Sequence, residues 1–346
     1  MENIKLPEVI SGECIKKELR IEVEKYNKIC VITGKTAFEK MKNTFEDVFK
    51  NKDVTIVWYG GECSEENIDS CVDKIKNQNI DLVIGVGGGK ALDTAKAVAD
   101  RLLIDIITVP TIAATCASYS AISIIYTPEG SFQSIYDMKQ QVKKVYIDMK
   151  VIFESPKKYM LAGIGDTLAK YYEVFLATSG KEINFKSILG KKISELCREM
   201  IINYSEKALE AKELNDEFKN VVNCIIIVTG KVAILIDKGY NGAIAHGVCC
   251  GLTVVEEIEK NVLHGNIVAF GILIQLLIEG KIEEYEKLKV MYKKIGLPTE
   301  ITDMCSAENY KEKFDEMIEA TLVAPNVQGL TVEVTKEILE KFLKIN

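Results

Sequence analysis

Short runs of hydrophobic residues alternate with amphipathic helical stretches along the first 150 residues. The runs are rich in β-branched residues and occupy residues 28–33, 54–59, 81–85 and 105–109. Helical patterns fill residues 37–49 and 65–79 between them. Strands that alternate with helices predict a parallel sheet covered by helices on both faces.

The hydrophobic pattern changes twice after this region. Residues 120–126, the turn at 127–130 and a strand-like stretch that ends at 145–147 predict a hairpin appended to the sheet. Beyond residue 148 helical periods dominate, and Ser155-Pro156 has the pattern of a helix start. The sequence therefore predicts an α/β domain over residues 1–150 and an all-helical domain over residues 151–346.

Charge and hydropathy exclude two classes of partner. A net charge of −7 and a pI near 5.3 argue against nucleic acid, since phosphate neutralisation requires a basic face. The longest apolar run, residues 267–278, is shorter than the roughly 20 residues of a membrane helix. Residues 1–7 lack the profile of a signal peptide. We expect a cytoplasmic protein that binds neither nucleic acid nor a membrane.

Cysteine and histidine usage limits the available chemistry. The ten cysteines contain no C-x-x-C pair and, without a secretion signal, are interpreted as reduced thiols. Only two histidines occur, His246 and His264. A three-histidine metal site is therefore excluded, and few residues remain for acid–base catalysis.

A glycine-rich turn is the most informative segment. Gly87, Gly88 and Gly89 follow the hydrophobic run of residues 81–85 and precede a helical pattern. Glycines let the backbone approach a ligand, and the N–H groups of the following helix suit a pyrophosphate. The pattern G-x-G-x-x-G does not fit, because Lys90 stands where the third glycine belongs. The P-loop pattern does not fit either, because Ala91 stands where that pattern requires Ser or Thr. A tight strand-to-helix turn without a ligand stays open as the alternative.

Residues 85–96 resemble the cofactor turn of the glycerol dehydrogenase branch of the iron-type (group III) alcohol dehydrogenases. The similarity continues in residues 110–126, 162–170, 245–253 and 264–271 and spans nearly the whole chain, weakening after about residue 280. The resemblance implies a dehydroquinate synthase-like dinucleotide-binding domain and a helical domain. It also implies an NAD(P)-dependent dehydrogenase with a divalent metal in the cleft between the two domains.

By position in the family's motifs, the metal ligands are Asp166, His246 and His264. One carboxylate and two imidazoles leave an open coordination position on Zn²⁺ or Fe²⁺, as a Lewis-acid catalyst needs. The histidines are 18 residues apart, and we expect them on two segments that fold together. The alternative is two ordinary helical histidines beside an aspartate that caps a helix.

The resemblance also implies a set of contacts to NAD(H) or NADP(H). Three groups are expected, respectively around the phosphates, after the next strand and at the nicotinamide end: Gly87, Gly88, Gly89, Lys90 and Asp93; Thr111 and Ala114; Ser120, Ile122 and Tyr126. Packing of the predicted hairpin is the alternative role for the last group.

The end of the first predicted strand departs from the NAD-preferring members of the family. Those members place an acidic residue there, whereas residues 33–36 contain no carboxylate and one cation, Lys35, after Gly34. Because an acidic group would repel a 2′-phosphate, its absence predicts that NADPH is tolerated or preferred. The alternative is that Lys35 is simply solvated.

Three further departures concern the substrate and the proton. Cys116 replaces an aspartate that contacts the polyol in glycerol dehydrogenases, and Lys170 replaces an uncharged residue. The pocket becomes more positive by about two charges, which predicts an anionic substrate such as a 2-oxo acid or a phosphorylated triol. A salt bridge from Lys170 to Asp166 or Glu173 is the alternative. Cys249 replaces a second family histidine and is expected to pack within its helix.

The sequence thus predicts a metal-dependent NAD(P)-linked dehydrogenase that interconverts a small secondary alcohol and its ketone, with a 2-hydroxy acid and 2-oxo acid as the expected pair. The hydroxycarboxylate dehydrogenase branch resembles the chain at both substrate positions. Glycerol or glycerol-1-phosphate dehydrogenase activity, a dehydroquinate synthase-like lyase and a non-catalytic nucleotide sensor remain alternatives. A homo-oligomer is expected from the resemblance.

Overall fold

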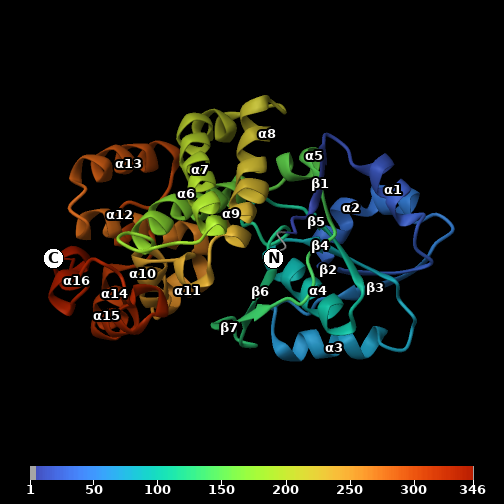
Figure 1. Cartoon of the computed structure of the whole chain (residues 1–346), viewed down its shortest axis with the longest axis horizontal. Helices are drawn as coiled ribbons and strands as arrows, with labels where there is room; N and C mark the ends of the chain where they lie inside the picture. Colours follow the sequence, from blue (N-terminus) through green and yellow to red (C-terminus); the bar gives the residue numbers. More distant parts are fainter. Residues whose placement is uncertain (1–4, 346) are drawn as a thin grey trace. The chain divides into compact units, whose positions relative to one another are not determined.

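The computed structural model describes residues 5–345 and divides the chain into two compact units after Pro156 (Figure 1). The predicted domain boundary near residue 150 lies slightly earlier. The difference arises because helix α5 (Met149–Phe153) places Val151 against the hydrophobic core of the first unit. Residues 1–4, part of the segment used to judge a signal peptide, lie outside the described residues.

The first unit contains a six-stranded parallel sheet with the strand order β1-β8-β5-β4-β2-β3. Its strands are β1 (Glu8–Gly12), β2 (Lys28–Thr33), β3 (Asp53–Trp58), β4 (Leu82–Gly87), β5 (Asp105–Pro110) and β8 (Lys144–Asp148). The four strands predicted from hydrophobic runs are present within two residues of their expected bounds. The sequence did not predict β1, whose positions are mostly exposed or half-buried.

Helices cover both faces of this sheet. They are α1 (Lys16–Val23), α2 (Lys35–Val48), α3 (Glu65–Ile75) and α4 (Gly89–Leu102). Right-handed crossovers place α1 and α2 on one face and α3 and α4 on the other (Figure 1). In α2, Met41, Phe45 and Val48 recur at helical spacing and are buried, which is why this segment forms an amphipathic helix.

The predicted hairpin is present, but its second arm differs from the expectation. Strands β6 (Ile122–Tyr126) and β7 (Phe132–Asp137) form a separate two-stranded antiparallel sheet. The stretch at residues 145–147 belongs to β8, between β1 and β5 in the large sheet, so its assignment to the hairpin is wrong. The burial explains the difference, since nearly every residue of β8 is buried whereas β7 is largely exposed.

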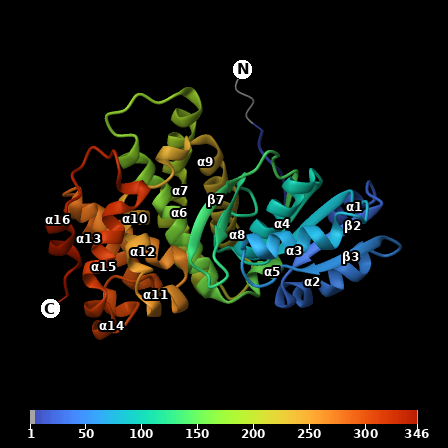
Figure 2. The ribbon, with the colours of Figure 1, turned by 90° about the horizontal axis from the view of Figure 1, so that it is seen from below.

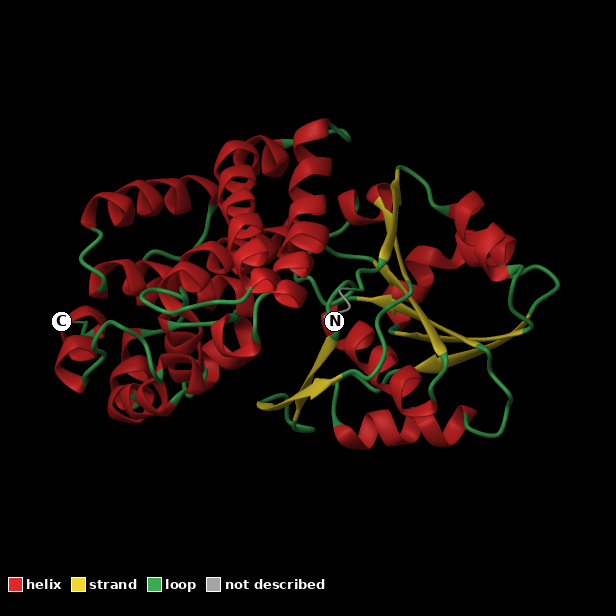
Figure 3. Ribbon diagram, in the orientation of Figure 1, coloured by secondary structure: helices red, strands yellow, loops and turns green. Residues whose placement is uncertain are grey.

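The second unit is helical throughout the described residues (Figure 3). Its α-helices are α6 (Lys157–Ala177), α7 (Phe185–Glu210), α8 (Asp216–Asn223), α9 (Thr229–Leu235), α10 (Ile244–Leu252), α11 (Glu256–Asn261), α12 (His264–Ile278), α13 (Ile282–Ile295), α14 (Ala307–Glu312), α15 (Phe314–Val323) and α16 (Lys336–Leu343). Helix α12 packs against α6 and α10 at the centre of this unit (Figure 2). Helix α6 begins at Lys157, directly after the Ser155-Pro156 pair expected to start it. The Ser155 hydroxyl donates a hydrogen bond to the carbonyl of Ile152.

One helix of this unit is long and apolar enough to cross a membrane by length and composition alone. It runs over Asp216–Leu235 and joins α8 and α9 through a π-helical segment at Cys224–Val228. In the structure 56% of its most apolar window is buried, and it packs against α7. A buried core helix of a globular unit has this same composition, so the segment is weak support for a membrane span.

Candidate metal centre and cofactor site

Three helices of the second unit bring the predicted metal ligands together. Asp166 lies on α6, His246 on α10, and His264 is the first residue of α12. One ligand atom from each side chain lies within 4.8 Å of the other two. The Nε2 atom of His246 is 3.9 Å from Oδ1 of Asp166. The two histidines lie on separate helices, as expected, with α11 between them.

Glycines next to two of these ligands allow the helices to approach closely. Gly165 precedes Asp166, and Gly265 follows His264. A Cβ atom at Gly165 would collide with the carbonyl of Gly265, and one at Gly265 would collide with the carbonyl of Ala162. Helices α6 and α12 therefore touch through their backbones at the level of the ligands, which sets the distance between Asp166 and His264.

A buried carboxylate holds His246 in place. Glu173, also on α6, is fully buried, and its Oε2 lies 2.5 Å from Nδ1 of His246. Burial alone would raise the pKa of Glu173, but the His246 side chain and two backbone N–H groups outweigh it and lower the pKa. From the sequence, Glu173 is expected only as a possible partner of Lys170. No local sequence signal distinguishes it from other helical glutamates.

The second histidine contacts a cysteine. Nδ1 of His264, whose side chain is exposed, lies 3.5 Å from Sγ of Cys249. Burial raises the pKa of the Cys249 thiol well above its ordinary value, so this group is a neutral thiol at physiological pH. Cys249 is buried in α10, as the sequence predicts, and in addition contacts a candidate metal ligand.

Lys170 is buried close to this cluster. Its side chain is 8% exposed, and Nζ donates a hydrogen bond of 3.2 Å to the carbonyl of Asn241. Within residues 5–345, no carboxylate oxygen lies within 4.0 Å of this ammonium nitrogen. The alternative of a salt bridge to Asp166 or Glu173 is therefore wrong. The Glu173 carboxylate is instead occupied by His246 and the backbone of α10.

The donor set of this cluster fits a divalent metal. Ligand atoms about 2.1 Å from one zinc ion are separated by no more than about 4.2 Å, and the 3.9 Å between His246 and Asp166 falls within that span. Two imidazoles and one carboxylate suit Zn²⁺ or Fe²⁺. Asp166, His246 and His264 can therefore hold such an ion with little movement.

The predicted cofactor residues lie at one edge of the parallel sheet. Strands β2, β4 and β5 are neighbours, so the turns at Gly34, Gly88 and Thr111 follow their carboxyl ends side by side. The chain leaves β2 toward β3 on one side and β4 toward β5 on the other. Ligands of such sheets bind outside the carboxyl ends where the direction reverses, here between β2 and β4.

The glycine turn has its own structural requirements. Gly87 has φ +144°, which disfavours other residues, and a Cβ atom at Gly88 would lie 2.7 Å from the Ile112 side chain. The tight-turn alternative thus accounts for two of the three glycines. Gly88 caps α4 without any side-chain hydrogen bond, so the first N–H groups of this 14-residue helix remain available to an anion.

Two charged residues of this turn are paired in the structure. Nζ of Lys90 lies 2.5 Å from Glu62 and 4.9 Å from the centre of the Tyr126 ring. Asp93 is buried, pairs with Lys96 at 2.8 Å and accepts the N–H of Ile124. Burial raises the pKa of Asp93, against the opposing effect of Lys96. The Asp93 carboxylate thus anchors the β6–β7 hairpin to α4.

Lys96 connects several of the predicted cofactor residues. Its ammonium donates to the carbonyl and hydroxyl of Ser120, at 3.3 and 3.1 Å, and to the carbonyl of Ile122. The Cys116 carbonyl accepts the N–H groups of Tyr119 and Ser120 and turns the preceding loop. The remaining predicted residues of the first unit, Ala114 and Lys35, are half-buried and exposed, respectively.

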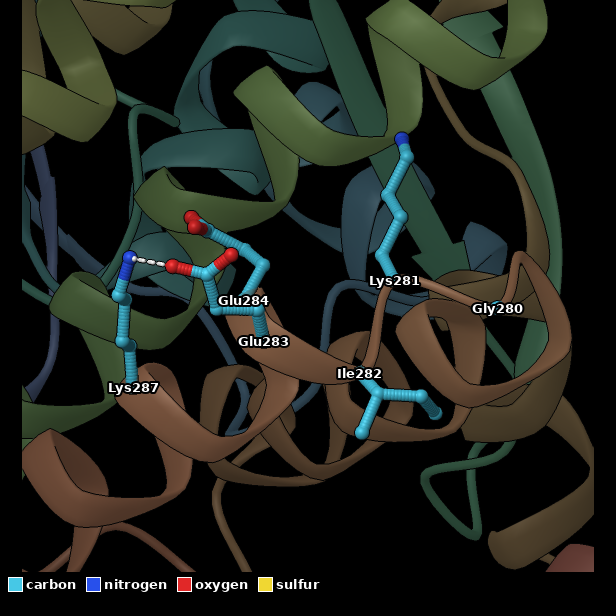
Figure 4. Close-up of a pocket in the computed structure, with 6 residues that line it drawn as sticks. All are labelled: Gly280, Lys281, Ile282, Glu283, Glu284 and Lys287. Carbon is cyan, nitrogen blue, oxygen red and sulfur yellow. Dashed lines mark hydrogen bonds and ion pairs between the residues drawn. The ribbon is translucent and has the colours of Figure 1, made fainter.

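A surface hollow lies at the start of α13 on this helical unit (Figure 4). It is lined by Gly280, Lys281, Ile282, Glu283, Glu284 and Lys287. Lys287 donates to Glu283 at 2.6 Å, and Glu284 accepts from Tyr172 and Arg198. Since these charges neutralise one another or bind neighbouring side chains, the hollow carries no recognisable chemistry.

A dinucleotide-type sheet edge and a metal-type ligand cluster within one chain are typical of metal-dependent dehydrogenases. The comparisons agree with this class. Residues 7–148 match the model of the iron-containing alcohol dehydrogenase family. The chain is 34% identical over 326 residues to hydroxycarboxylate dehydrogenase A of Escherichia coli, covering 93% of this chain and 90% of that protein.

Other relatives carry a glycerol dehydrogenase name. The chain is 32% identical to glycerol dehydrogenase of Thermotoga maritima, covering 77% of this chain and 72% of that protein. The crystal structure of a probable glycerol dehydrogenase from Sinorhizobium meliloti superimposes with a TM-score of 0.88 and 25% identity, covering 99% and 97% of the two chains. The chain belongs to the iron-containing alcohol dehydrogenase family.

Family membership confirms the expected fold class, the NAD(P)-linked oxidation of an alcohol group and the use of a divalent metal. A sulfoacetaldehyde reductase from Bifidobacterium kashiwanohense in complex with NAD⁺ shares the fold alone, with a TM-score of 0.77 and 17% identity over 99% of this chain and 98% of that one.

Proposed function

We propose that this dehydrogenase interconverts a small 2-hydroxy acid and the corresponding 2-oxo acid. Asp166, His246 and His264 would hold the metal, and Lys170 would bind the substrate carboxylate. The single observation that carries the choice of an anionic substrate is the buried Lys170 ammonium, which has one carbonyl acceptor and no carboxylate partner among the described residues.

The charge of Lys170 reaches the metal ligands. Burial and the Lys170 ammonium both act against protonation of His246, although the Glu173 carboxylate outweighs them and raises the pKa of His246. An ammonium group has three donor hydrogens, and only one is used by Asn241. A buried charge without a partner is unfavourable. A substrate carboxylate bound next to Lys170 would neutralise the ammonium group, and the ammonium would in turn hold the carboxylate.

Cys116 supports the same substrate class. An aspartate at this position, as in the glycerol dehydrogenases that the sequence resembles, would repel a carboxylate, whereas a thiol does not. The loss of one negative charge at Cys116 and the gain of one positive charge at Lys170 act in the same direction.

In the reaction, the metal would polarise the substrate oxygen and the dinucleotide would exchange the hydride. The chain's own residues position the reactants. Lys170 would hold the carboxylate that adjoins the reacting carbon, so the substrate is fixed at two points. The turn Gly87–Gly89 and the N-terminus of α4 would bind the pyrophosphate, next to Thr111 and Ala114.

The cofactor is proposed to include NADP(H). Lys35 is exposed at the first position of α2, directly after Gly34, and no carboxylate follows β2 within residues 33–36. The hairpin residues Ser120, Ile122 and Tyr126 would adjoin the nicotinamide end, with Lys90 and Asp93 at the turn. A cytoplasmic location and a homo-oligomer are also proposed. None of the ten cysteines, all of which lie within the described residues 5–345, forms a disulfide, which supports a reducing compartment.

The test is metal analysis coupled to an oxidation assay with NADH and NADPH. The purified enzyme is assayed on 2-oxobutanoate and on dihydroxyacetone before and after chelation. We expect a higher kcat/KM on 2-oxobutanoate, loss of activity on chelation, and recovery with Zn²⁺ or Fe²⁺. Equal or higher activity on dihydroxyacetone would overturn the anionic substrate and favour glycerol dehydrogenase activity, the name that several relatives carry.

The same assay separates the other candidates. A dehydroquinate synthase-like lyase would turn over substrate without a net change in cofactor absorbance. A glycerol-1-phosphate dehydrogenase would respond to dihydroxyacetone phosphate more than to 2-oxobutanoate. A nucleotide sensor would bind NADH with no turnover of any ketone.

A further inference from the structure

Glu173 has a geometry that goes beyond support of the fold. It lies on α6 seven residues after Asp166, which places both side chains on the same face of the helix. Its side chain is fully buried, and its two oxygens contact different groups at the start of α10: Oε1 accepts backbone N–H groups, and Oε2 faces the His246 imidazole. These two sets of contacts imply two separable roles.

The first oxygen caps a helix. Oε1 accepts the N–H groups of Ala243 and His246, at 2.7 and 2.8 Å. These groups lie at the start of α10, where N–H groups have no acceptor within the helix. Gln275 of α12 contributes a second acceptor, because its Oε1 accepts the N–H of Ala245 at 3.4 Å. Helix capping is thus shared between two buried side chains.

The second oxygen is not needed for the cap and faces the imidazole. Oε2 lies 2.5 Å from Nδ1 of His246. An ionised carboxylate only accepts hydrogen bonds, so Nδ1 must carry the hydrogen. In the neutral imidazole the lone pair is then on Nε2, the nitrogen that lies 3.9 Å from Oδ1 of Asp166.

We propose that Glu173 is a positioning residue that fixes the Nδ1–H tautomer of His246 and thereby presents Nε2 to the metal. The inference rests on His246 being a metal ligand. It assigns to a residue outside the ligand set the task of selecting which imidazole nitrogen binds. Outer-shell partners of this kind contribute about 10- to 100-fold to metal affinity.

The variant Glu173→Gln separates the two roles. The amide oxygen can still accept the N–H groups of Ala243 and His246, so the cap is retained. The amide NH₂ group then faces Nδ1 and donates to it, which moves the imidazole hydrogen to Nε2 and blocks the ligand position. We expect the dissociation constant for Zn²⁺, measured by chelator competition on the metal-free protein, to rise about 10- to 100-fold.

The matched control is Gln275→Met. This change removes the other side-chain acceptor at the start of α10 without touching the imidazole. We expect a lower melting temperature and an unchanged zinc dissociation constant. If Gln275→Met weakens zinc as much as Glu173→Gln does, Glu173 acts only as a cap and the proposal is overturned.

Nuclear magnetic resonance reads the tautomer directly, because the chain contains only two histidines. Metal-free protein labelled with ¹⁵N-histidine is recorded in alkaline solution, and His264→Gln assigns the signals. We expect an Nδ1–H pattern for His246 in the wild type and an Nε2–H pattern in Glu173→Gln. An Nε2–H pattern in the wild type overturns the proposal, even where the variant does not fold.

The two readouts keep this inference distinct from the proposed function. A wild-type protein with the Nδ1–H tautomer that is active on dihydroxyacetone but not on 2-oxobutanoate would sink the substrate assignment and leave the role of Glu173 intact. A 2-oxo acid reductase whose zinc affinity is unchanged by Glu173→Gln would overturn the role of Glu173 and leave the substrate assignment intact.

Discussion

Two buried lysines, one in each unit, lie one helical turn beyond an aspartate and have opposite surroundings. Lys96 is 0% exposed, pairs with Asp93 at 2.8 Å and donates to oxygens of Ser120 and Ile122. Lys170 is 8% exposed, and within residues 5–345 its ammonium has one hydrogen-bond acceptor, the carbonyl of Asn241 at 3.2 Å. The same residue type, three residues after the aspartate for Lys96 and four residues after it for Lys170, is thus compensated in one helix and uncompensated in the other.

The difference distinguishes a lysine that stabilises the fold from a lysine whose charge can bind a ligand. Moving an ammonium group out of water is unfavourable unless a counter-charge and hydrogen bonds replace the lost hydration. The fold supplies all of these to Lys96, which ties the β6–β7 hairpin to α4. It supplies little to Lys170, so the charge of Lys170 remains available to an anionic ligand.

The largest effect is expected for Lys96→Met. The change leaves the buried Asp93 carboxylate without its counter-charge, and loss of one partner of a buried ion pair costs about 3–5 kcal/mol. The free energy of unfolding, measured by urea titration, should fall by that amount. The double variant Asp93→Asn with Lys96→Met should recover part of the loss. A Lys96→Met protein as stable as the wild type would remove the contrast between the two lysines.

A smaller and more selective effect is expected for Lys170→Met. Since the hydrogen bond to a charged group contributes about 1.5–3 kcal/mol, kcat/KM for 2-oxobutanoate should fall about 10- to 100-fold. The stability should be unchanged or higher, because an uncompensated buried charge is removed. The neutral ketone 2-butanone is the control substrate, and an equal loss of activity on both ketones would contradict a carboxylate-binding role.

The smallest effect is expected for Lys35→Ala, the exposed lysine at the start of α2. Exposed ion pairs contribute about 0.2–1 kcal/mol, so the ratio of kcat/KM for NADPH over NADH should fall by no more than about fivefold. The effect should shrink as ionic strength rises, because salt screens exposed charges. An unchanged ratio at low salt would show that Lys35 is only solvated.

Much of the fold and part of the candidate site could be predicted from sequence. Hydrophobic runs gave β2, β3, β4 and β5 because a buried parallel strand is apolar at nearly every position. The three candidate metal ligands came from motifs that resemble a known family, and the structure places them together. The role of Glu173 could not be predicted, since a glutamate in a helix carries no local sign that it will meet an imidazole 73 residues later.

The β8 strand shows the same limit within the fold. Its residues have strand character, which the sequence revealed, but its neighbours β1 and β5 lie far away along the chain. A strand's propensity depends on its own side chains, whereas its place in a sheet depends on pairing energies between distant segments.

The amino-acid sequence alone determined the alternation of strands and helices, the glycine turn and the choice of candidate metal ligands, because these depend on adjacent residues and short motifs. Only the tertiary structure decided which buried charges are compensated. Lys96 meets Ser120 and Ile122, and Lys170 meets Asn241, 71 residues later in the chain. The free energy of a buried charge depends on all the groups packed around it, and packing brings those groups from segments that no local pattern connects.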